Sequence, residues 1–512
     1  MNKLGKKINW IIGVIFIVYF GYTLLSVLCL EYTVAYKTRT YQYSNLVPMV
    51  CVIVTLAFTV WLSRRKFIPK IEMMKKQKFY LLLVAISIVV FGVQLFLMKY
   101  LAKPIDFDFQ KVRATAMALA FEHKFIHQNY FNLFRINRPI VFIFAMILSV
   151  FKNWMAVCAI GVIFSNLSVL LTAQIIYKVT GKKCISLFMF FMGIILFDFN
   201  FRVFVPYTDN YGVFFLAFAA FIFVNRKDKW CWKILGVISL AIGFWIKVTG
   251  AILIIAGGIV LVGLHLPDKK KFVKNAFVLA IVFVGTYLAA NGISQSYFHA
   301  NGLKETPEKQ ITVWHYFMMG ENDAHLGTVS SKDLSFSCSF STVKERNAAN
   351  IKKGLKRIKN RGVSGNLFFY TYKNFQNYND GCFSPVQKSI KGEKWGDSLV
   401  ERLFLKRYDE NRFYAMVEQA IWLLVLCLIL VSAFNRKEEN KALLYWKLVI
   451  LGVSAYVLIF ESRAKYLFMF LPFYLILASC GLKFLLSEIS EKEQKKSTSQ
   501  QVNGAEDTVK IS

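Results

Sequence analysis

The chain has 512 residues, of which 56% are hydrophobic, 16% are aromatic and 18% are charged, and its mean hydropathy is +0.46. This composition excludes a soluble globular protein, and apolar runs of roughly 15–23 residues indicate helical membrane spans rather than barrel strands. The net charge of +33 lies largely in short Lys- and Arg-rich loops between apolar runs, so it predicts contact with membrane lipids and no nucleic-acid partner.

About twelve spans are predicted, which makes the chain an all-α polytopic membrane protein. In chain order they are residues 9–30, 46–62, 80–98, 155–177, 184–199, 211–225, 232–246, 249–264, 272–292, 416–434, 443–460 and 466–486. Residues 139–151 are apolar but too short for a standard span. If they do not cross, every short basic loop faces the cytoplasm, as the positive-inside rule requires. We therefore expect a re-entrant or interface-lying helix there, and both chain ends in the cytoplasm.

Two segments then lie outside the cell, and each has helical character. Residues 112–128 of the first outer loop place Val112, Ala116 and Leu119 on one helical face. Residues 343–361 form a basic amphipathic pattern that could lie on the membrane or pack onto its own loop. The predicted units are a two-span extension (1–79), a core with first outer loop 99–153 (80–292), a loop domain (293–415), a three-span segment (416–487) and a disordered tail (488–512).

Cysteine and histidine spacing gives little evidence for a metal centre. Cys338 and Cys382 fall in the long loop and could pair if it faces an oxidising compartment, and no zinc-type Cys/His spacing is present. His123 and His127 have the i, i+4 spacing of metal ligands but lack an obvious third ligand, so surface or packing roles are expected.

Two carboxylates, Asp106 and Asp108, follow the predicted span 80–98 directly. Ionisable groups at a membrane boundary are costly to place and tend to be functional. The alternative is that either one caps the helix that begins near Val112, which would not exclude a catalytic role.

Further polar clusters fall on the same predicted side. They contain Asn137, Tyr207, Asp209, Lys247, His315, Asp380, Glu461, Arg463, Lys465 and Tyr466. Asp209 could cap the next span, Arg463 and Lys465 could be interface anchors, and His315 could be structural or bind an acceptor. Together, however, the clusters supply a carboxylate base and cations for a lipid phosphate, which glycosyl transfer from a lipid-linked donor needs.

The order of these motifs resembles the GT-C superfamily of membrane glycosyltransferases, which includes protein O-mannosyltransferases and lipid A aminoarabinose transferases. Gram-positive bacterial members are the most similar, with Asp-x-x-x-Val, Tyr-Pro-Asn-Asn, Tyr-(Ser/Thr)-Asp-Thr and Glu-x-Arg-x-Arg-Tyr. The resemblance covers residues 80–486. It implies a bacterial cell-membrane enzyme with an extracellular site, a polyprenyl-phosphate-sugar donor and a cell-surface glycan, teichoic-acid-like polymer or glycolipid acceptor.

The resemblance also implies roles for individual residues. Asp108, which has the family spacing to Val112, matches the catalytic aspartate, and Asp106 is its reserve. Asp209 matches the second acidic position, while Glu461, Arg463 and Tyr466 match the late motif that faces the donor. Lys465 replaces the usual Arg, Asn210 replaces Thr, and the segment ending at Asn137 departs from Tyr-Pro-Asn-Asn. Some members need Mg²⁺ or Mn²⁺, which Asp106, Asp108 and Asp209 could bind.

Two other function classes remain. A transporter or flippase of lipid-linked saccharides would place ionisable or helix-breaking residues near the middle of its spans, whereas here the polar clusters gather on one side. A non-catalytic membrane assembly protein would fit the altered segment at Asn137. The one-sided distribution favours chemistry at the membrane surface.

Overall fold

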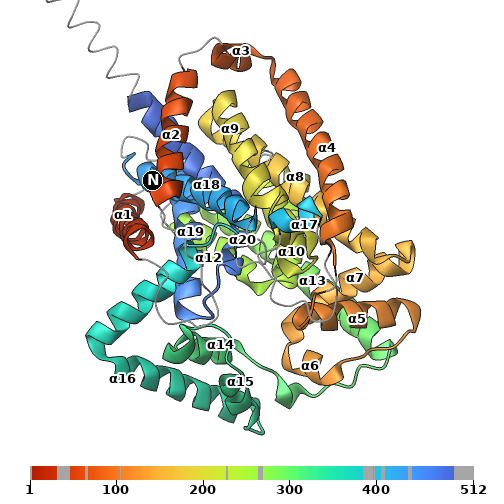
Figure 1. The fold of residues 1–512 in the computed structure, drawn as a ribbon. Coiled ribbons are helices and arrows are strands. Elements are labelled where there is room, and N and C mark those ends of the chain that lie inside the picture. Colours follow the sequence, from red (N-terminus) through yellow and green to blue (C-terminus); the bar gives the residue numbers. More distant parts are fainter. Residues whose placement is uncertain are drawn as a thin grey trace, which may run out of the picture.

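The protein is a bundle of helices in the computed structural model, which describes residues 3–30, 46–63, 67–103, 105–225, 229–262, 269–383, 396, 398–404, 410–435 and 441–488. Within these ranges no residue lies in a β-strand. Figure 1 shows the long helices packed alongside one another, with several shorter helices at one end. The predicted all-α class is therefore confirmed.

Eight helices of the described part are long and apolar enough to cross a membrane. They are α1 (Lys3–Cys29), α4 (Lys76–Leu101), α8 (Trp154–Thr180), α10 (Thr208–Asn225), Phe272–Ala300 within α13 (Lys269–Ala300), α18 (Glu410–Ala433), α19 (Lys441–Ile459) and the last helix, Leu471–Glu488. The other four predicted spans fall on α2 (Leu46–Ser63), α9 (Lys183–Gly193), α11 (Trp230–Ile246) and α12 (Ala251–Val262). Every predicted span is thus mostly helical over its described residues, and the count of twelve stays a prediction.

One predicted span, 184–199, is not a continuous α-helix. After α9 the chain forms the π-helix η2 (Ile194–Asp198) and then the 3₁₀-helix η3 (Phe201–Phe204). π-helical turns are rare in proteins, and those that occur are often found at functional sites. This irregular segment carries Arg202 into the interior, where only 3% of its surface is exposed.

The remaining elements connect the spans, and all of them are short except α16, which has 36 residues. On the end with the predicted site they are α5 (Asp108–Phe121), α6 (Gln128–Leu133), η1 (Arg135–Asn137), α7 (Arg138–Phe151), η5 (Pro307–Lys309), α14 (Val313–Gly320), η6 (Asp323–His325), α15 (Ser331–Cys338) and α16 (Val343–Tyr378). The remaining ones are α3 (Phe67–Met73), η4 (Val248–Gly250), α17 (Leu399–Phe404) and α20 (Lys465–Phe468).

The apolar segment at 139–151 forms α7, a helix of 14 residues. At 1.5 Å per residue it is about 21 Å long, which is shorter than the roughly 30 Å hydrocarbon core. Its buried residues Ile140, Phe144 and Leu148 share one face, and α7 packs against α5. In α5, Val112, Ala116 and Leu119 are buried together as predicted.

The long loop is also helical. α16 starts with a capping box between Thr342 and Glu345, and its first stretch ends at residue 361 as predicted, because the backbone at Gly362 is not helical. A second helical stretch then runs to Tyr378. α16 packs on α14 and α15, so the predicted packing onto its own loop is confirmed. Residues 384–395 and most of the tail lie outside the described residues, and the domain boundaries stay predictions.

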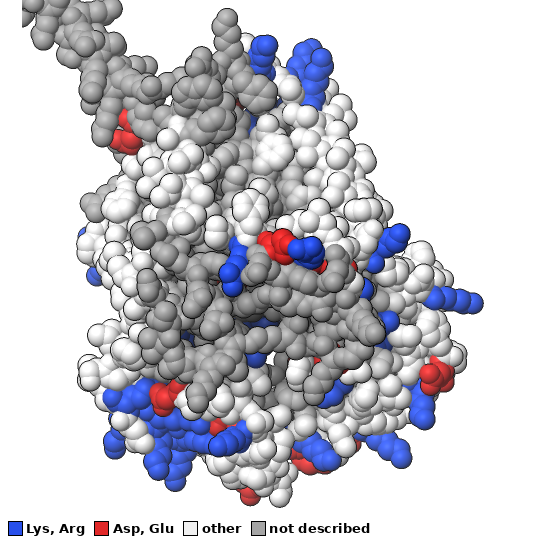
Figure 2. Space-filling model, viewed as in Figure 1, with Lys and Arg blue, Asp and Glu red and all other residues white. Residues whose placement is uncertain are grey.

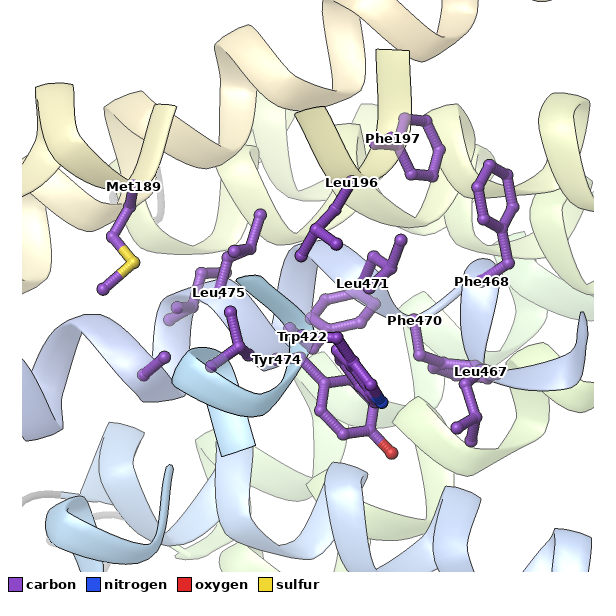
Figure 3. Close-up of a cluster of buried hydrophobic side chains, with 14 of the residues drawn as sticks. Met189, Leu196, Phe197, Trp422, Leu467, Phe468, Phe470, Leu471, Tyr474 and Leu475 are labelled. Carbon is purple, nitrogen blue, oxygen red and sulfur yellow. The ribbon is translucent and has the colours of Figure 1, made fainter. Parts of the chain in front are cut away.

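The hydrophobic core lies directly beneath the turn that follows α19. Figure 3 shows Phe197, Phe468 and Trp422 within it. The rings of Phe197 and Phe468 stack with centroids 4.4 Å apart, and Phe468 is fully buried. Because close-packed interiors transmit strain, this stack fixes the position of α20 and of the polar turn that precedes it.

Candidate functional site

The predicted site residues converge at one end of the bundle, where several elements begin or end. Asp108 starts α5, Asn137 ends η1, and Lys247 directly follows α11. Asp209 lies in the first turn of α10, and Glu461 follows α19. Side chains at element ends can approach one another without breaking the helices of the bundle.

Asp108 is exposed, whereas Asp106 is half-buried. Phe107 occupies the N-cap position of α5 and makes no side-chain cap bond, and Asp108 is the first helical residue. Phe107 has φ 65° and ψ −132°, a strained conformation for a residue other than glycine. Such strained residues cluster at functional sites, and Phe107 lies between the two carboxylates.

A hydrogen-bonded chain runs from Asp108 into the protein. The Asp108 carboxylate acts on the Tyr130 hydroxyl, whose pKa is raised by burial and then by this charge. Nδ2 of Asn137 donates to that hydroxyl at 2.7 Å, and the Tyr207 hydroxyl donates to Oδ1 of Asn137 at 3.0 Å. The rings of Phe109 and Tyr207 are 4.5 Å apart. Asn137 and Tyr207 thus support the surroundings of Asp108.

Asp209 forms two buried ion pairs. Its Oδ2 lies 3.4 Å from Nη2 of Arg202, and its Oδ1 pairs with the ammonium of Lys247. Only 2% of the Asp209 side chain is exposed. A buried carboxylate between two cations is held in one geometry, because moving either partner would leave a buried charge uncompensated.

The turn between α19 and α20 adds a second charged group. Glu461 accepts a hydrogen bond from the Tyr466 hydroxyl, and its Oε1 lies 3.4 Å from Nε of Arg463. Although burial opposes them, Lys465 and Arg463 lower the pKa of Glu461. Burial lowers the pKa of Lys465 to about 8. The charge of Glu461 acts to raise this pKa, and the nearby cations lower it further.

Tyr207 and Tyr316 connect these groups electrostatically. After burial, the pKa of Tyr207 is raised by Tyr130, Asp108 and Asp209. After burial, the pKa of Tyr316, in α14, is raised by Glu461, Tyr456 and Asp108. Both phenols are therefore close enough to Asp108 to be affected by its charge. Tyr207 is also affected by Asp209, and Tyr316 by Glu461.

Basic side chains outnumber the acidic ones in the combined group. Arg202, Lys247, Arg463 and Lys465 interact with Asp209, Glu461 and Asp380, the last of which acts on Arg202. The ammonium of Lys247 also lies 5.1 Å from the Tyr466 ring centroid. Because this group contains four cations and three carboxylates, it can hold one more anion, such as a phosphate.

The other predicted residues have distinct surroundings. His315 is buried, and its Nδ1 lies 2.7 Å from Oγ of Ser337 in α15. Burial lowers the pKa of His315 to about 4, although the charges of Asp333 and Glu461 act to raise it. Oδ1 of Asp380 accepts from the Cys382 amide at 3.1 Å. His315 thus joins α14 to α15 as a neutral side chain near the Glu461 group.

The structure also bears on metal and disulfide sites. Among the described residues, no three or more His, Cys, Asp or Glu side chains are placed to hold a metal ion, so Asp106, Asp108 and Asp209 do not form the ligand set considered from the sequence. Cys338 and Cys382 are both free thiols in the structure, so the pairing that the sequence left open is not made.

Three site residues were missed by the sequence analysis. Arg202, Tyr130 and Tyr316 all act on the predicted residues. Arg202 had a signal, since it is the only cation in the largely apolar stretch from residue 184 to 206. The two tyrosines also had a signal, since Tyr130 shortly precedes Asn137 and Tyr316 is adjacent to His315.

Comparison with known proteins gives a family. The family model described as "Conserved hypothetical integral membrane protein" matches residues 4–484. No curated protein and no solved structure matches the chain. Since the match covers far more than half of the sequence, the chain belongs to this family of integral membrane proteins.

Proposed function

We propose that the protein is a membrane glycosyltransferase of the GT-C type. It moves a sugar from a polyprenyl-phosphate donor to a cell-surface glycan, a teichoic-acid-like polymer or a glycolipid on the outer face of the membrane. One observation carries the proposal: two carboxylates act on the same tyrosine, Tyr316. One is the exposed Asp108, and the other is Glu461, whose own neighbours are the cations Lys465 and Arg463.

The cationic group is the donor side. Arg463 and Lys465 neutralise the lipid phosphate and stabilise the charge that grows on it as the sugar leaves. Arg202 and Lys247 are engaged with Asp209, so they hold the group together and add positive potential. A partly exposed Arg463 is available for the phosphate, since 28% of its side chain is accessible.

Asp108 is the acceptor side. It removes the proton from the acceptor hydroxyl while that oxygen attacks the anomeric carbon. The bond between the anomeric carbon and the phosphate oxygen breaks, and the electron pair leaves with polyprenyl phosphate. Attack opposite to the leaving group inverts the anomeric configuration. Tyr130 and Asn137 position the region around the base.

A transporter of lipid-linked saccharides is the alternative, and buried carboxylates favour it. Oε1 of Glu418, within α18, accepts from Asn200 at 3.0 Å and from the Tyr414 hydroxyl at 2.7 Å. Asp198 accepts from Ser165 at 2.7 Å. Ionisable residues inside spans often mark transport pathways. The partners of these two carboxylates are neutral donors of the bundle, which suits structural roles equally, although Oε2 of Glu418 is buried without a hydrogen-bond partner among the described residues.

One reconstitution separates the two functions. Purified protein is placed in proteoliposomes with a polyprenyl-phosphate donor labelled in its sugar, together with a panel of hydroxyl acceptors. If the protein is a transferase, the label moves to an acceptor and polyprenyl phosphate is released. Movement of the intact donor across the bilayer without any transfer contradicts it and supports the transporter.

A further inference from the structure

Helix α16 is bent into two arms at Gly362. This residue has φ 64° and ψ −171°, a conformation that is essentially confined to glycine. Residues 343–361 form the first arm and residues 363–378 the second. Figure 1 shows the bend as a corner that projects from the side of the molecule near α1. A bend that depends on glycine fixes where this corner points.

The corner exposes large apolar side chains. Val363 is 91% exposed, Leu367 is 67% exposed and Phe368 is 64% exposed. Clustered apolar exposure of this kind marks a surface that meets another apolar phase. The opposite face of α16 is occupied, since a Cβ on Gly354 would lie 2.6 Å from the Phe317 ring and Arg357 donates to the Met318 carbonyl at 2.6 Å.

The corner continues the lipid-exposed surface of α1. Thr371, one turn beyond Leu367, contacts the Tyr22 hydroxyl, and the Tyr19 hydroxyl donates to Asn374 at 2.6 Å. α1 is one of the candidate spans, and its residues Val18 and Leu25 are 65% and 62% exposed. Apolar side chains one turn from that surface therefore lie next to the membrane boundary.

The first arm brings positive charge to the same corner. Lys352, Lys356 and Lys359 are exposed and form no ion pair with a described carboxylate, whereas Arg357 and Arg361 are paired inward with acidic side chains. Lys359 lies three residues before the bend at Gly362, at the end of the first arm. Figure 2 shows basic side chains gathered over this part of the molecule.

We propose that the α16 corner is an interfacial anchor in the leaflet beside α1. Val363, Leu367 and Phe368 insert at the level of the headgroups, and Lys356 and Lys359 bind anionic lipid headgroups. Basic helices with exposed apolar residues bind membranes in this way, through buried apolar area and electrostatic attraction.

The anchor reaches the candidate site through Lys373, in the second arm. Its buried ammonium donates to the Gly320 carbonyl at 2.6 Å and to the Phe460 carbonyl at 2.8 Å. Phe460 directly precedes Glu461. The depth of the corner in the leaflet thereby sets the height of the charged turn above the bilayer.

Spin labels test the anchor in lipid nanodiscs. Phe368→Cys is labelled in a variant lacking exposed native cysteines, and Lys332→Cys on the exposed surface of α15 is the matched control. We expect the label at 368 to collide several-fold more with oxygen than with an aqueous nickel chelate, and the label at 332 to show the reverse. Nickel accessibility at 368 equal to that at 332 overturns the proposal, as does protection from both reagents, which would place protein there.

The lysines are tested in the same system. With the lysines intact, the preference of the label at 368 for oxygen should increase as phosphatidylglycerol replaces phosphatidylcholine. With Lys356→Gln and Lys359→Gln added, this increase should disappear. An equal response in both proteins overturns the role of the lysines.

Discussion

The Tyr207 hydroxyl donates a hydrogen bond to Oδ1 of Asn137 at 3.0 Å, and Nδ2 of the same asparagine donates to the Tyr130 hydroxyl at 2.7 Å. Asn137 is 7% exposed, so these groups satisfy one another rather than water. The chain connects the start of α10 to the tyrosine beside Asp108, and it gives the first prediction.

Tyr207→Phe should weaken both stability and transfer. It removes the donor to Asn137 and leaves a buried oxygen unsatisfied, which typically costs about 1–3 kcal/mol. Thermal unfolding in detergent and the rate of sugar transfer measure the two effects. Tyr297→Phe is the control, because its hydroxyl donates to the Leu119 carbonyl at 3.2 Å, away from Asp108. Equal transfer by the two variants would remove the positioning role.

Lys247 and Asp209 should be energetically coupled. In a double-mutant cycle with Lys247→Met and Asp209→Asn, we expect a coupling free energy of roughly 1–3 kcal/mol, because breaking a buried pair strands a charge. The exposed pair Arg402 and Glu410 provides the control cycle, in which solvent should leave much weaker coupling. Additive effects at Lys247 and Asp209 would mean that the buried pair is not formed.

Donor binding should depend on the charge of Lys465. Because burial lowers its pKa to about 8, the ammonium deprotonates as pH rises through this value and the donor phosphate loses a partner. We expect kcat/KM for the donor to fall above about pH 8. In Lys465→Arg the fall should disappear, since guanidinium stays charged. An unchanged profile in this variant would assign the titration to another group.

The same pKa predicts a change in stability. The unfolded chain keeps this lysine proton to a higher pH than the folded protein does, so the free energy of unfolding should increase as pH rises from about 8 toward the ordinary lysine value. Denaturant unfolding at several pH values measures it. In Lys465→Met the free energy of unfolding should no longer increase over this pH range. An increase as large as that of the wild-type protein would contradict the assignment.

The predicted topology places two native cysteines on opposite sides of the membrane. Cys338 is exposed in α15, near the site, and Cys231 is exposed at the opposite end of α11 from Lys247. In single-cysteine variants, an impermeant maleimide applied to intact cells should label Cys338 and should label Cys231 only after permeabilisation. The reverse pattern would place the candidate site in the cytoplasm.

Much of the fold follows from the sequence, because lipid requires each span to satisfy its own backbone. The run at 155–177 becomes α8, and the short run at 139–151 becomes the short helix α7. The π turn at Ile194–Asp198 was not predicted, since hydropathy registers apolar content and not the hydrogen-bond register within a helix.

The site was predicted in part. Asp209 and Lys247 were both expected to lie on one side of the membrane, and the structure pairs them directly. Arg202, the second partner of Asp209, was missed because it lies in η3, within an irregular segment that the sequence does not reveal. The end of the basic helix at residue 361 was predicted, but the bend at Gly362 and the second helical stretch after it were not, since glycine permits a positive φ without requiring one.

The most direct test of the transferase is the comparison of Asp108→Asn with Asp106→Asn in the transfer assay. Both substitutions remove one carboxylate from the same segment, and membrane protein levels are matched. If Asp108 is the base, Asp108→Asn should lose at least about a hundredfold in transfer rate, as removal of a general base typically does. Asp106→Asn should retain most of the rate. Wild-type transfer by Asp108→Asn would contradict the account.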